Sequence, residues 1–327
     1  MQATVAKVIS VTRHPNADAL DVITVLGWQC VAKIGEFRPG DLVAYVFIDS
    51  VMPDRSEFAF LGSSRRVKTR MIRGELSQGI CFPMSIVPEG APHAEGDDLT
   101  ELLGVTHYEK PIPAVLGAKS KGDFPSFVPK TDEPMIQSCA EVLGELEGLP
   151  YYITEKANGS STTVFFNQGV FGVCSRNFEI ENDGRNTYWA VAGRHGLEGR
   201  FHEMGRNLAV QAELVGPGIQ KNELGLKQHE LFVFNVYDID SRRILGYAPM
   251  MEVVGKLGLP SVRLIEQGDS FGYDMQTLLK MAAGIYEGTK NRREGIVVRP
   301  LEPVYSNVLR TRLSFKVLSN EYLVKEG

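Results

Sequence analysis

The first 88 residues contain five short stretches rich in β-branched and aromatic residues, a composition typical of β-strands. Turn-forming pairs such as Pro-Asn, Pro-Gly and Gly-Glu separate them. The stretches are ATVAKVISV, DVITVLGW, QCVAKIG, DLVAYVFI and QGICFPM. This number of short strands predicts a small barrel. A five-stranded OB-like β-barrel is expected, because closing the sheet leaves few exposed edges.

The pattern changes after residue 105. Residues 106–133 contain four prolines and two glycines, which disfavour a continuous helix or strand. We therefore expect an OB-like domain over 1–105, a linker over 106–123 and a second domain over 124–327. Within the second domain, the segment IQSCAEVLGEL has helical spacing of its apolar residues.

From residue 151 onward, strand-like stretches alternate with two helical patches. The patches run from YWAVAGRHG to HEMGRNL and over MQTLLKMAAGIYE. The predicted strands are YYITEK, STTVFF, VFGVCSR, AVQAELV, ELFVFNVYDI, EGIVVRP and RLSFKVL. Runs of strands with inserted helices predict an α+β domain.

Composition narrows the class of protein. The 327 residues are 43% hydrophobic and 23% charged, which excludes a disordered chain. No run of about 18 apolar residues occurs, so no membrane span is expected, and the first residues do not resemble a signal peptide. The four cysteines are far apart, which disfavours a disulfide framework or zinc site. We expect a cytoplasmic protein, and a monomer.

The net charge of −5 argues against a protein that coats nucleic acid through bulk charge. It leaves room for a local basic patch. Residues 65–73, RRVKTRMIR, form the densest positive stretch, with Arg65, Arg66, Lys68, Arg70 and Arg73. Such side chains bind phosphates without reading sequence. A solvated strand edge that discourages aggregation is the alternative interpretation.

A lysine follows the first strand of the second domain. In TEKANGSS, Glu155 and Lys156 precede Asn158 and Gly159. A lysine amine becomes nucleophilic only when burial or a nearby cation lowers its pKa from the usual value of about 10.4. A surface lysine beside an Asn-Gly hairpin turn is the simpler interpretation.

Other polar residues interrupt or end apolar strands, where an unpaired charge is costly. Arg176 and Asn177 end VFGVCSRN, and arginine suits phosphate or ribose contact. Glu213 alternates with Ala212 and Leu214, so its side chain is expected on the opposite face of the strand, toward a cleft or toward water.

Three more residues belong to this pattern. Phe234 lies in a strand and is either a core residue or a stacking surface. Glu294 precedes a very apolar strand. Lys316 lies between Phe315 and Val317, where it either reaches the surface or meets an anion.

The order of these elements resembles the motifs of covalent nucleotidyltransferases, which include RNA ligases, DNA ligases and mRNA capping enzymes. The series is Lys-x-Asn-Gly, Ser-Arg-Asn, Glu-Leu-x-Gly-x-Gly-Ile-Gln, Phe-Asn-Val, Glu-Gly-Ile-Val-Val and Ser-Phe-Lys-Val. TEKANGSS and AELVGPGIQKN are similar to motifs of ATP-dependent RNA ligases of the T4 RNA ligase 2 branch. An OB-like domain placed before the transferase domain resembles the Deinococcus and Naegleria type, the fifth RNA ligase family. The resemblance implies a nucleotidyltransferase domain of antiparallel sheets with helices.

The resemblance also implies residue roles. Lys156 attacks the α-phosphate of ATP, and the AMP then passes to an RNA 5′-phosphate, which a 3′-hydroxyl attacks. Lys316 holds the α-phosphate and lowers the pKa of Lys156. The nucleotide contacts are Phe234 on adenine, Glu155 beside adenine, and Glu213, Arg176 and Asn177 at the ribose. Glu294 and Asn158 hold Mg²⁺ (or Mn²⁺) through water, because Mg²⁺ keeps much of its water shell.

Two positions depart from the family pattern. Many relatives have aspartate where this chain has Asn158, so a direct metal contact there is in doubt. Many also have lysine where this chain has Ser314, and Arg310, Arg312 or Lys290 are candidates to replace its charge.

Two other functions stay open from sequence. One is a DNA ligase or GTP-using capping-type enzyme, which differs in the nucleotide that labels the protein and in the strand that is sealed. The other is a nucleic-acid-binding module with an inactive transferase domain. The joint presence of Lys156, Glu213, Glu294 and Lys316 argues against an inactive domain.

Overall fold

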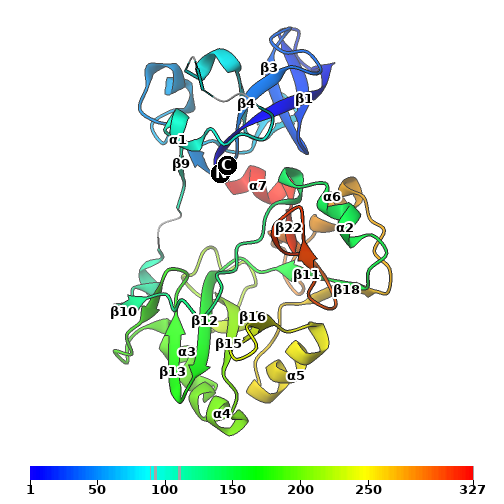
Figure 1. Cartoon of the computed structure of the whole chain (residues 1–327). Helices are drawn as coiled ribbons and strands as arrows, with labels where there is room; N and C mark the ends of the chain where they lie inside the picture. The colour runs from blue at the N-terminus through cyan, green and yellow to red at the C-terminus, as the bar shows by residue number, and fades with distance from the viewer. Residues whose placement is uncertain (89, 92–93, 110–111, 327) are drawn as a thin grey trace. The chain divides into compact units, whose positions relative to one another are not determined.

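The computed structural model describes residues 1–88, 90–91, 94–109 and 112–326. The chain forms two compact units. The first comprises residues 1–110, 136–140 and 320–327, and the second comprises 111–135 and 141–319. Each unit is described by itself below, with the elements labelled as in Figure 1.

The first unit is built on a five-stranded antiparallel sheet of order β3-β2-β1-β4-β8. The long strand β1 pairs with β4 along residues 3–7 and with β2 along residues 8–13, and a register irregularity lies between Val8 and Ser10. This change of partner lets the sheet curl around its core. The strands are β1 (Ala3–Arg13), β2 (Leu20–Val25), β3 (Trp28–Lys33), β4 (Leu42–Val46) and β8 (Ile80–Pro83). All five strands predicted from sequence are present.

Smaller elements complete the first unit. A two-stranded hairpin, β6–β7, lies between β4 and β8 along the chain, and β5 pairs with β9. Their bounds, with the helices, are β5 (Ser50–Val51), β6 (Arg70–Ile72), β7 (Glu75–Ser77), β9 (Thr106–His107), α1 (Thr100–Leu103) and α7 (Asn320–Glu326). Gln78 Nε2 donates to Asn320 Oδ1 at 3.3 Å, so the C-terminal helix α7 is part of this unit.

The expected linker contains regular structure. Within residues 106–123, β9 pairs with β5 of the first unit, and β10 (Ser120–Asp123) pairs with β14 of the second. Residues 110–111, inside that span, lie outside the described residues. The prolines break the segment into short pieces, which include a 3₁₀ turn (Ala114–Leu116) between the two strands.

The second unit contains two large antiparallel sheets and a two-stranded sheet formed by β20 (Tyr305–Ser306) and β21 (Thr311–Arg312). The larger has the order β10-β14-β13-β12-β15-β16-β17 and the smaller has the order β18-β11-β19-β22. The larger sheet contains β12 (Ser160–Asn167), β13 (Val170–Cys174), β14 (Phe178–Ile180), β15 (Leu208–Val215), β16 (Glu230–Asp238) and β17 (Arg243–Ile244). The smaller contains β11 (Tyr151–Lys156), β18 (Leu264–Gly268), β19 (Gly295–Pro300) and β22 (Phe315–Leu318).

Helices cover one face of the larger sheet. Alternate residues of β15, including Val210, Ala212 and Leu214, pack in a core with Phe201 and Val253. Period-two alternation places Gln211 and Glu213 on the opposite face. The covering helices are α3 (Thr187–Arg194), α4 (Leu197–Met204) and α5 (Tyr247–Leu257). The sheet therefore keeps one face for the core and offers the other for polar chemistry.

The helix predictions are confirmed in part. α3, α4 and α6 (Met275–Ala282) lie in the two expected patches, and IQSCAEVLGEL forms a short 3₁₀ turn and α2 (Val142–Leu146). The helix α5 was not predicted, although Met250, Val253, Val254 and Leu257 are buried on one face. In the described part of the chain, no helix is long and apolar enough to cross a membrane.

Candidate functional site

Lys156 is the last residue of β11. Its strand pairs with β18 and β19, and Lys156 lies opposite Gly295, so the residue does not belong to a hairpin with β12. Only 26% of its side chain is exposed. The interpretation as a surface hairpin lysine is therefore wrong, because β11 and β12 belong to different sheets.

The amine of Lys156 is paired with a carboxylate. Lys156 Nζ lies 2.8 Å from Glu294 Oε1. Burial disfavours the charged amine, but Glu294 and Glu213 outweigh burial, so the pKa of Lys156 is raised above its usual value. The expectation of a lowered Lys156 pKa is wrong in this structure, since two carboxylates lie near the amine.

Lys316 contributes a second cation to the site. It lies on β22 opposite Val297 of β19, and its backbone N–H donates to Pro134 O at 2.9 Å. Burial and the charge of Lys156 lower the pKa of Lys316. The repulsion between the two amines therefore contributes to the lowered pKa of Lys316, while the nearby carboxylates keep the pKa of Lys156 raised.

Glu213 connects the larger sheet to the turn after Lys156. Its Oε1 accepts a hydrogen bond from Gly159 N at 3.0 Å. Burial and the neighbouring Glu294 outweigh Lys156 and raise the pKa of Glu213 to about 7. A Cβ atom on Gly159 would lie 2.3 Å from Leu214 O, so only glycine lets the turn approach β15 this closely.

Asn158 is held by a residue that the sequence analysis did not identify. Its Nδ2 donates to Glu223 Oε2 at 3.0 Å, and both side chains are buried. Glu223 belongs to a polar Lys-Asn-Glu-Leu-Gly segment typical of a surface loop, so its sequence carried no signal of burial.

Tyr286 was also missed. This side chain is 1% exposed, and its hydroxyl donates to Lys156 O at 2.8 Å and accepts from Glu294 N at 3.1 Å. The hydroxyl therefore joins the backbones of the two residues that form the ion pair. Burial raises the pKa of Tyr286, which keeps it neutral and able to donate.

The expected nucleotide-contact residues differ in their exposure and in their contacts. Arg176 is exposed and pairs with Asp132 at 2.7 Å, and its charge influences both Lys156 and Glu213. Asn177 is exposed. Phe234 is half-buried and packs against an apolar cluster that includes Ala157 and Val262.

Glu155 takes part in a separate ion-pair network. Its Oε1 lies 3.3 Å from Arg263 Nη1 and 3.6 Å from Arg293 Nη1. Burial outweighs the two guanidinium groups, so the pKa of Glu155 is raised. This pairing was not foreseen for a residue expected beside adenine.

The buried Ser314 faces an arginine that the sequence analysis did not consider. Arg299 Nε donates to Ser314 Oγ at 2.9 Å, and Arg299 Nη2 lies 2.8 Å from Glu133 Oε1. Arg312 also pairs with Glu133 and donates to Asn235 Oδ1 at 3.1 Å. Two guanidinium groups thus share one carboxylate, which leaves a net positive charge beside the position where relatives have lysine.

The basic stretch of the first unit is divided between paired and exposed residues. Arg65 pairs with Asp54 at 2.6 Å. Arg66 Nε donates to Asp49 Oδ1 at 3.0 Å, and its guanidinium lies 3.9 Å from the centre of the Tyr108 ring.

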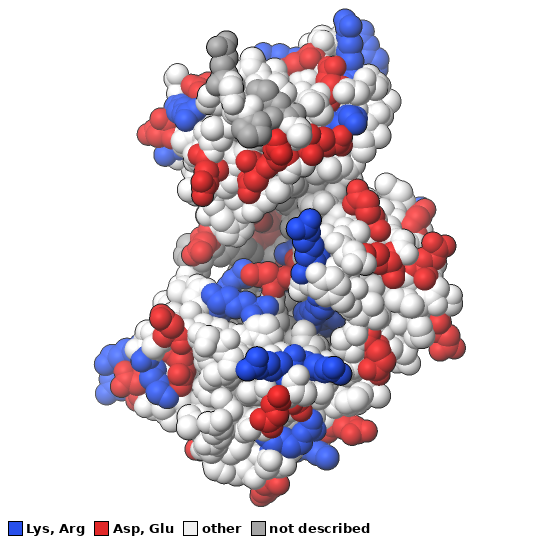
Figure 2. All heavy atoms as spheres, viewed as in Figure 1, with Lys and Arg blue, Asp and Glu red and all other residues white. Residues whose placement is uncertain are grey.

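Arg70 and Arg73 are exposed at the β6–β7 hairpin, while Lys68 is half-buried. On the face shown in Figure 2, acidic and basic side chains are interspersed over each unit.

The donors near Lys156 suit a hard divalent cation. Glu294, Glu213 and Asn158 offer oxygen atoms, which Mg²⁺ and Mn²⁺ prefer. Among the described residues, no group of three or more His, Cys, Asp or Glu side chains is placed to hold a metal directly. The residues therefore fit a cation that is held through water and phosphate oxygens.

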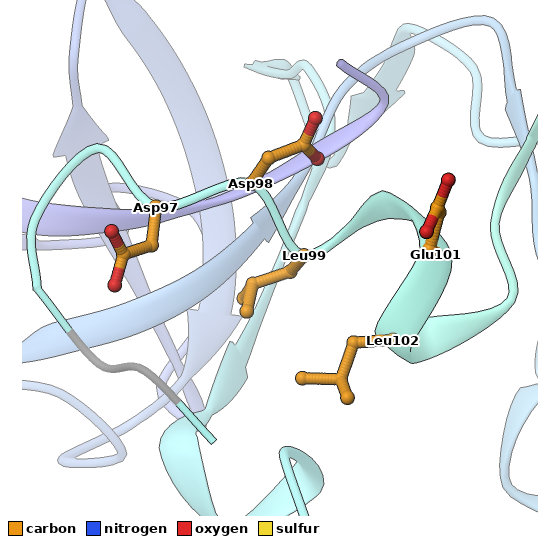
Figure 3. Close-up of a pocket in the computed structure, with 5 residues that line it drawn as sticks. All are labelled: Asp97, Asp98, Leu99, Glu101 and Leu102. Carbon is orange, nitrogen blue, oxygen red and sulfur yellow. The ribbon is translucent and has the colours of Figure 1, made fainter.

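A separate hollow of the first unit does not suit a nucleotide. Three carboxylates, of Asp97, Asp98 and Glu101, line it with Leu99 and Leu102 (Figure 3). Asp97 Oδ2 accepts from Ala94 N, and Asp98 Oδ1 accepts from Thr100 N, each at 2.8 Å. These carboxylates stabilise local turns and would repel phosphate.

Comparisons with known proteins agree with this geometry. A family model described as RNA ligase matches residues 149–318, and one described as an OB-fold domain matches residues 2–84. No curated protein matches the chain.

Solved structures of an RNA ligase from Naegleria gruberi are similar to the whole chain. A lysine-to-alanine variant with ATP and Mn is 33% identical, with a TM-score of 0.92, over 99% of each chain. A glutamate-to-alanine variant with AMP and Mn has 33% identity and a TM-score of 0.91, and the ligase with PPi has 33% identity and a TM-score of 0.90. Each of these two comparisons covers 99% of this chain and 98% of the other. The expected fold, an OB domain followed by a ligase domain, is confirmed, and the chain belongs to the RNA ligase family.

Proposed function

We propose that this protein is an ATP-dependent RNA ligase that joins a 3′-hydroxyl to a 5′-phosphate through a covalent lysyl-AMP on Lys156. The observation that carries the proposal is the position of Lys156 Nζ, 2.8 Å from Glu294 and close to the charges of Glu213 and Lys316. The Naegleria ligase structures contain ATP, AMP, PPi and Mn, which supports ATP and a divalent metal as cofactors here.

In the first step, the nitrogen of Lys156 attacks the α-phosphorus of ATP. The N–P bond forms as the P–O bond to the β-phosphate breaks, and pyrophosphate leaves with the electron pair. The amine must first give up its proton to water, which requires the ion pair with Glu294 to break. Lys316 then favours the neutral amine through repulsion and neutralises charge on the α-phosphate.

The remaining steps transfer the AMP and seal the strand. The 5′-phosphate of RNA attacks the lysyl-AMP, which gives an adenylylated RNA end and frees the amine. The 3′-hydroxyl then attacks that end, and AMP leaves. A divalent cation, when bound, supplies positive charge beside the phosphates. Glu294 and Asn158 would hold it through water.

The proposed nucleotide contacts follow the residues that surround the amine. Glu213 binds the ribose hydroxyls together with Arg176 and Asn177, and Phe234 stacks on adenine. Glu155 lies beside the base in this proposal. Its pairing with Arg263 and Arg293 supports a role in fixing the end of β11.

We also propose that the first unit binds RNA through Arg70 and Arg73, assisted by Lys68, Arg65 and Arg66. The exposed positions of Arg70 and Arg73 support this assignment. The protein acts as a monomer in the cytoplasm in this proposal. None of the four cysteines, all of which the structure describes, forms a disulfide, which supports a reducing compartment.

One experiment tests the central step. The protein is incubated with Mg²⁺ and ATP labelled at the α-phosphate, then denatured, and the label on the chain is measured. We expect label on the wild type and none on Lys156→Ala, with GTP ineffective. Label that persists in Lys156→Ala would refute the nucleophile, and label from GTP alone would favour the capping-type alternative.

A further inference from the structure

A loop over residues 216–226 follows β15 and contacts the turn after Lys156. Its path requires left-handed backbone at Gln220 and Asn222, with φ of 47° and 46°, a conformation that non-glycine residues rarely adopt. The Asn222 side chain closes the loop, because Oδ1 accepts from Leu226 N at 3.1 Å and Nδ2 donates to Leu226 O at 2.9 Å. These hydrogen bonds hold the loop in one conformation, although Gln220 and Asn222 have strained backbone angles.

This loop holds the turn at two adjacent residues. Gln220 Nε2 donates to Gly159 O at 3.2 Å, and Glu223 Oε2 accepts from Asn158 Nδ2 at 3.0 Å. The backbone of Glu223 is itself fixed, since its carbonyl accepts from Asn291 Nδ2 at 2.7 Å. The loop thus places the buried carboxylate of Glu223 against Asn158, the residue of the turn for which a direct metal contact was in doubt.

The chemistry of the pair determines the orientation of the amide. An ionised carboxylate only accepts hydrogen bonds, whereas a carboxamide has one donating and one accepting side. Glu223 therefore selects the orientation in which Nδ2 of Asn158 faces it. Within the described residues, Oδ1 of Asn158 accepts no hydrogen bond. The amide consequently retains an acceptor that can orient a metal-bound water.

We propose that Glu223 is a positioning residue that acts through Asn158, and that the pair replaces a carboxylate at position 158. Asn158 supplies the acceptor oxygen, and Glu223 supplies the negative charge and fixes the amide. This inference rests on the proposed ligase function and deepens it, since it assigns part of the cation environment to Glu223, which directly follows the AELVGPGIQKN motif.

Two single substitutions and their combination test the pair. Asn158→Asp places a second carboxylate against Glu223, and Glu223→Gln removes the negative charge. In the double variant Asn158→Asp/Glu223→Gln, the new amide donates to the new carboxylate, which restores one hydrogen bond and one charge. We expect each single change to weaken Mn²⁺ affinity and the rate of protein adenylylation about 10- to 100-fold. The double variant is expected to recover to within about tenfold of wild type.

Two readouts separate this role from a merely structural one. Mn²⁺ affinity is measured by electron paramagnetic resonance without nucleotide, and adenylylation is measured in a single turnover with α-labelled ATP. The exposed pair Asn207–Asp240, in which Nδ2 donates to Oδ1 at 2.8 Å, is the matched control. Asn207→Asp and Asp240→Asn should change neither readout.

The outcomes distinguish the inference from the proposed function. Additive losses without recovery in the double variant overturn the inference. The inference is also overturned if the single variants have a lower unfolding midpoint but unchanged Mn²⁺ affinity, because that result indicates a structural role. If the wild type takes no label, the proposed function fails, and recovery of Mn²⁺ affinity still decides whether the pair forms a cation environment. A wild type that binds no Mn²⁺ overturns the inference directly.

Discussion

Lys156 Nζ lies 2.8 Å from Oε1 of Glu294, so the proposed nucleophile and a proposed metal-site carboxylate neutralise each other in this structure. The pair keeps the pKa of Lys156 above its usual value against the effect of burial. The first chemical step therefore depends on separating these two side chains. The charges around Lys156 therefore determine the reactivity of its amine as much as the lysine itself does.

Changing Glu294→Gln should lower the pKa of Lys156, because it removes the carboxylate that raises that pKa most. The alkaline rise in the rate of protein adenylylation should move to lower pH, while the maximal rate falls because the cation has one carboxylate fewer to hold it. Single-turnover labelling across pH measures both effects. Glu287→Gln is the control, since Glu287 is exposed and pairs only with Arg263 among the described residues. A rise that stays at the wild-type pH would contradict this explanation.

Glu213 should make stability depend on pH in the neutral range. Its folded-state pKa of about 7 exceeds the usual value of 4.5, so between these pH values the folded chain binds a proton that the unfolded chain does not. The free energy of unfolding should therefore decrease as pH rises from about 4.5 to 7. Glu213→Gln should remove this contribution, which thermal unfolding at several pH values can measure. Glu147→Gln, at an exposed residue, should keep the wild-type dependence.

Tyr286→Phe should affect both stability and catalysis. The change leaves Lys156 O and Glu294 N without their shared hydroxyl partner. We expect a loss of about 1–3 kcal/mol in the free energy of unfolding, because buried polar groups lose hydrogen bonds. Adenylylation should slow as Lys156 and Glu294 lose alignment. Tyr237→Phe is the control, since Tyr237 is buried as a residue and its hydroxyl makes no hydrogen bond among the described residues. Equal urea midpoints for the two variants would contradict this role.

The sequence correctly predicted those elements that a local pattern of residue types is sufficient to identify. The five barrel strands carry runs of β-branched residues between turn signals, and Glu213 follows strict alternation with buried neighbours. The helix α5 carried a signal too, since four buried apolar residues have helical spacing between Gly246 and Gly258. Pro249 weakens that signal, because proline breaks helices except in their first turn, where it lies here.

The residues that sequence reasoning missed act through long-range contacts. Tyr286 and Lys156 are 130 positions apart, and Arg299 meets Glu133 across 166 positions. Arg299 lay in a strand interpreted as apolar, where a buried charge becomes plausible only once its carboxylate partner is known. The pKa of Lys156 could not be predicted for the same reason, since it depends on how close Glu294 and Glu213 approach.

RNA affinity should depend on the exposed arginines of the β6–β7 hairpin. Arg70→Ala and Arg73→Ala should weaken binding and reduce the slope of log affinity against log salt, by about 0.7 for each phosphate of a single strand that the variant no longer neutralises. Arg66→Ala, combined with Arg70→Ala, should weaken binding further, although the pairing of Arg66 with Asp49 limits its share. Arg242→Ala, at an exposed turn, is the control. A salt slope unchanged by all these substitutions would reject the hairpin as an RNA-binding element.

Glu133→Gln should be the most destabilising of these changes. Burial opposes ionisation of Glu133, but Arg312 and Arg299 outweigh it and lower its pKa to about 2. Without this carboxylate, two buried guanidinium groups face each other, and breaking a buried ion pair of this kind costs about 3–5 kcal/mol. Because the folded-state pKa lies below the usual 4.5, the stabilisation is complete above about pH 4.5 and is lost as pH falls toward 2.

Urea unfolding of wild type and Glu133→Gln at pH 7 and pH 3 tests this account, with the difference between them expected to shrink at the lower pH. Glu141→Gln, at an exposed residue, serves as the control at both values. A difference of equal size at pH 7 and pH 3 would show that the carboxylate stabilises the unit through packing and not through its charge. In that case, Arg299 and Arg312 would keep their positions near Ser314 without the negative charge of Glu133.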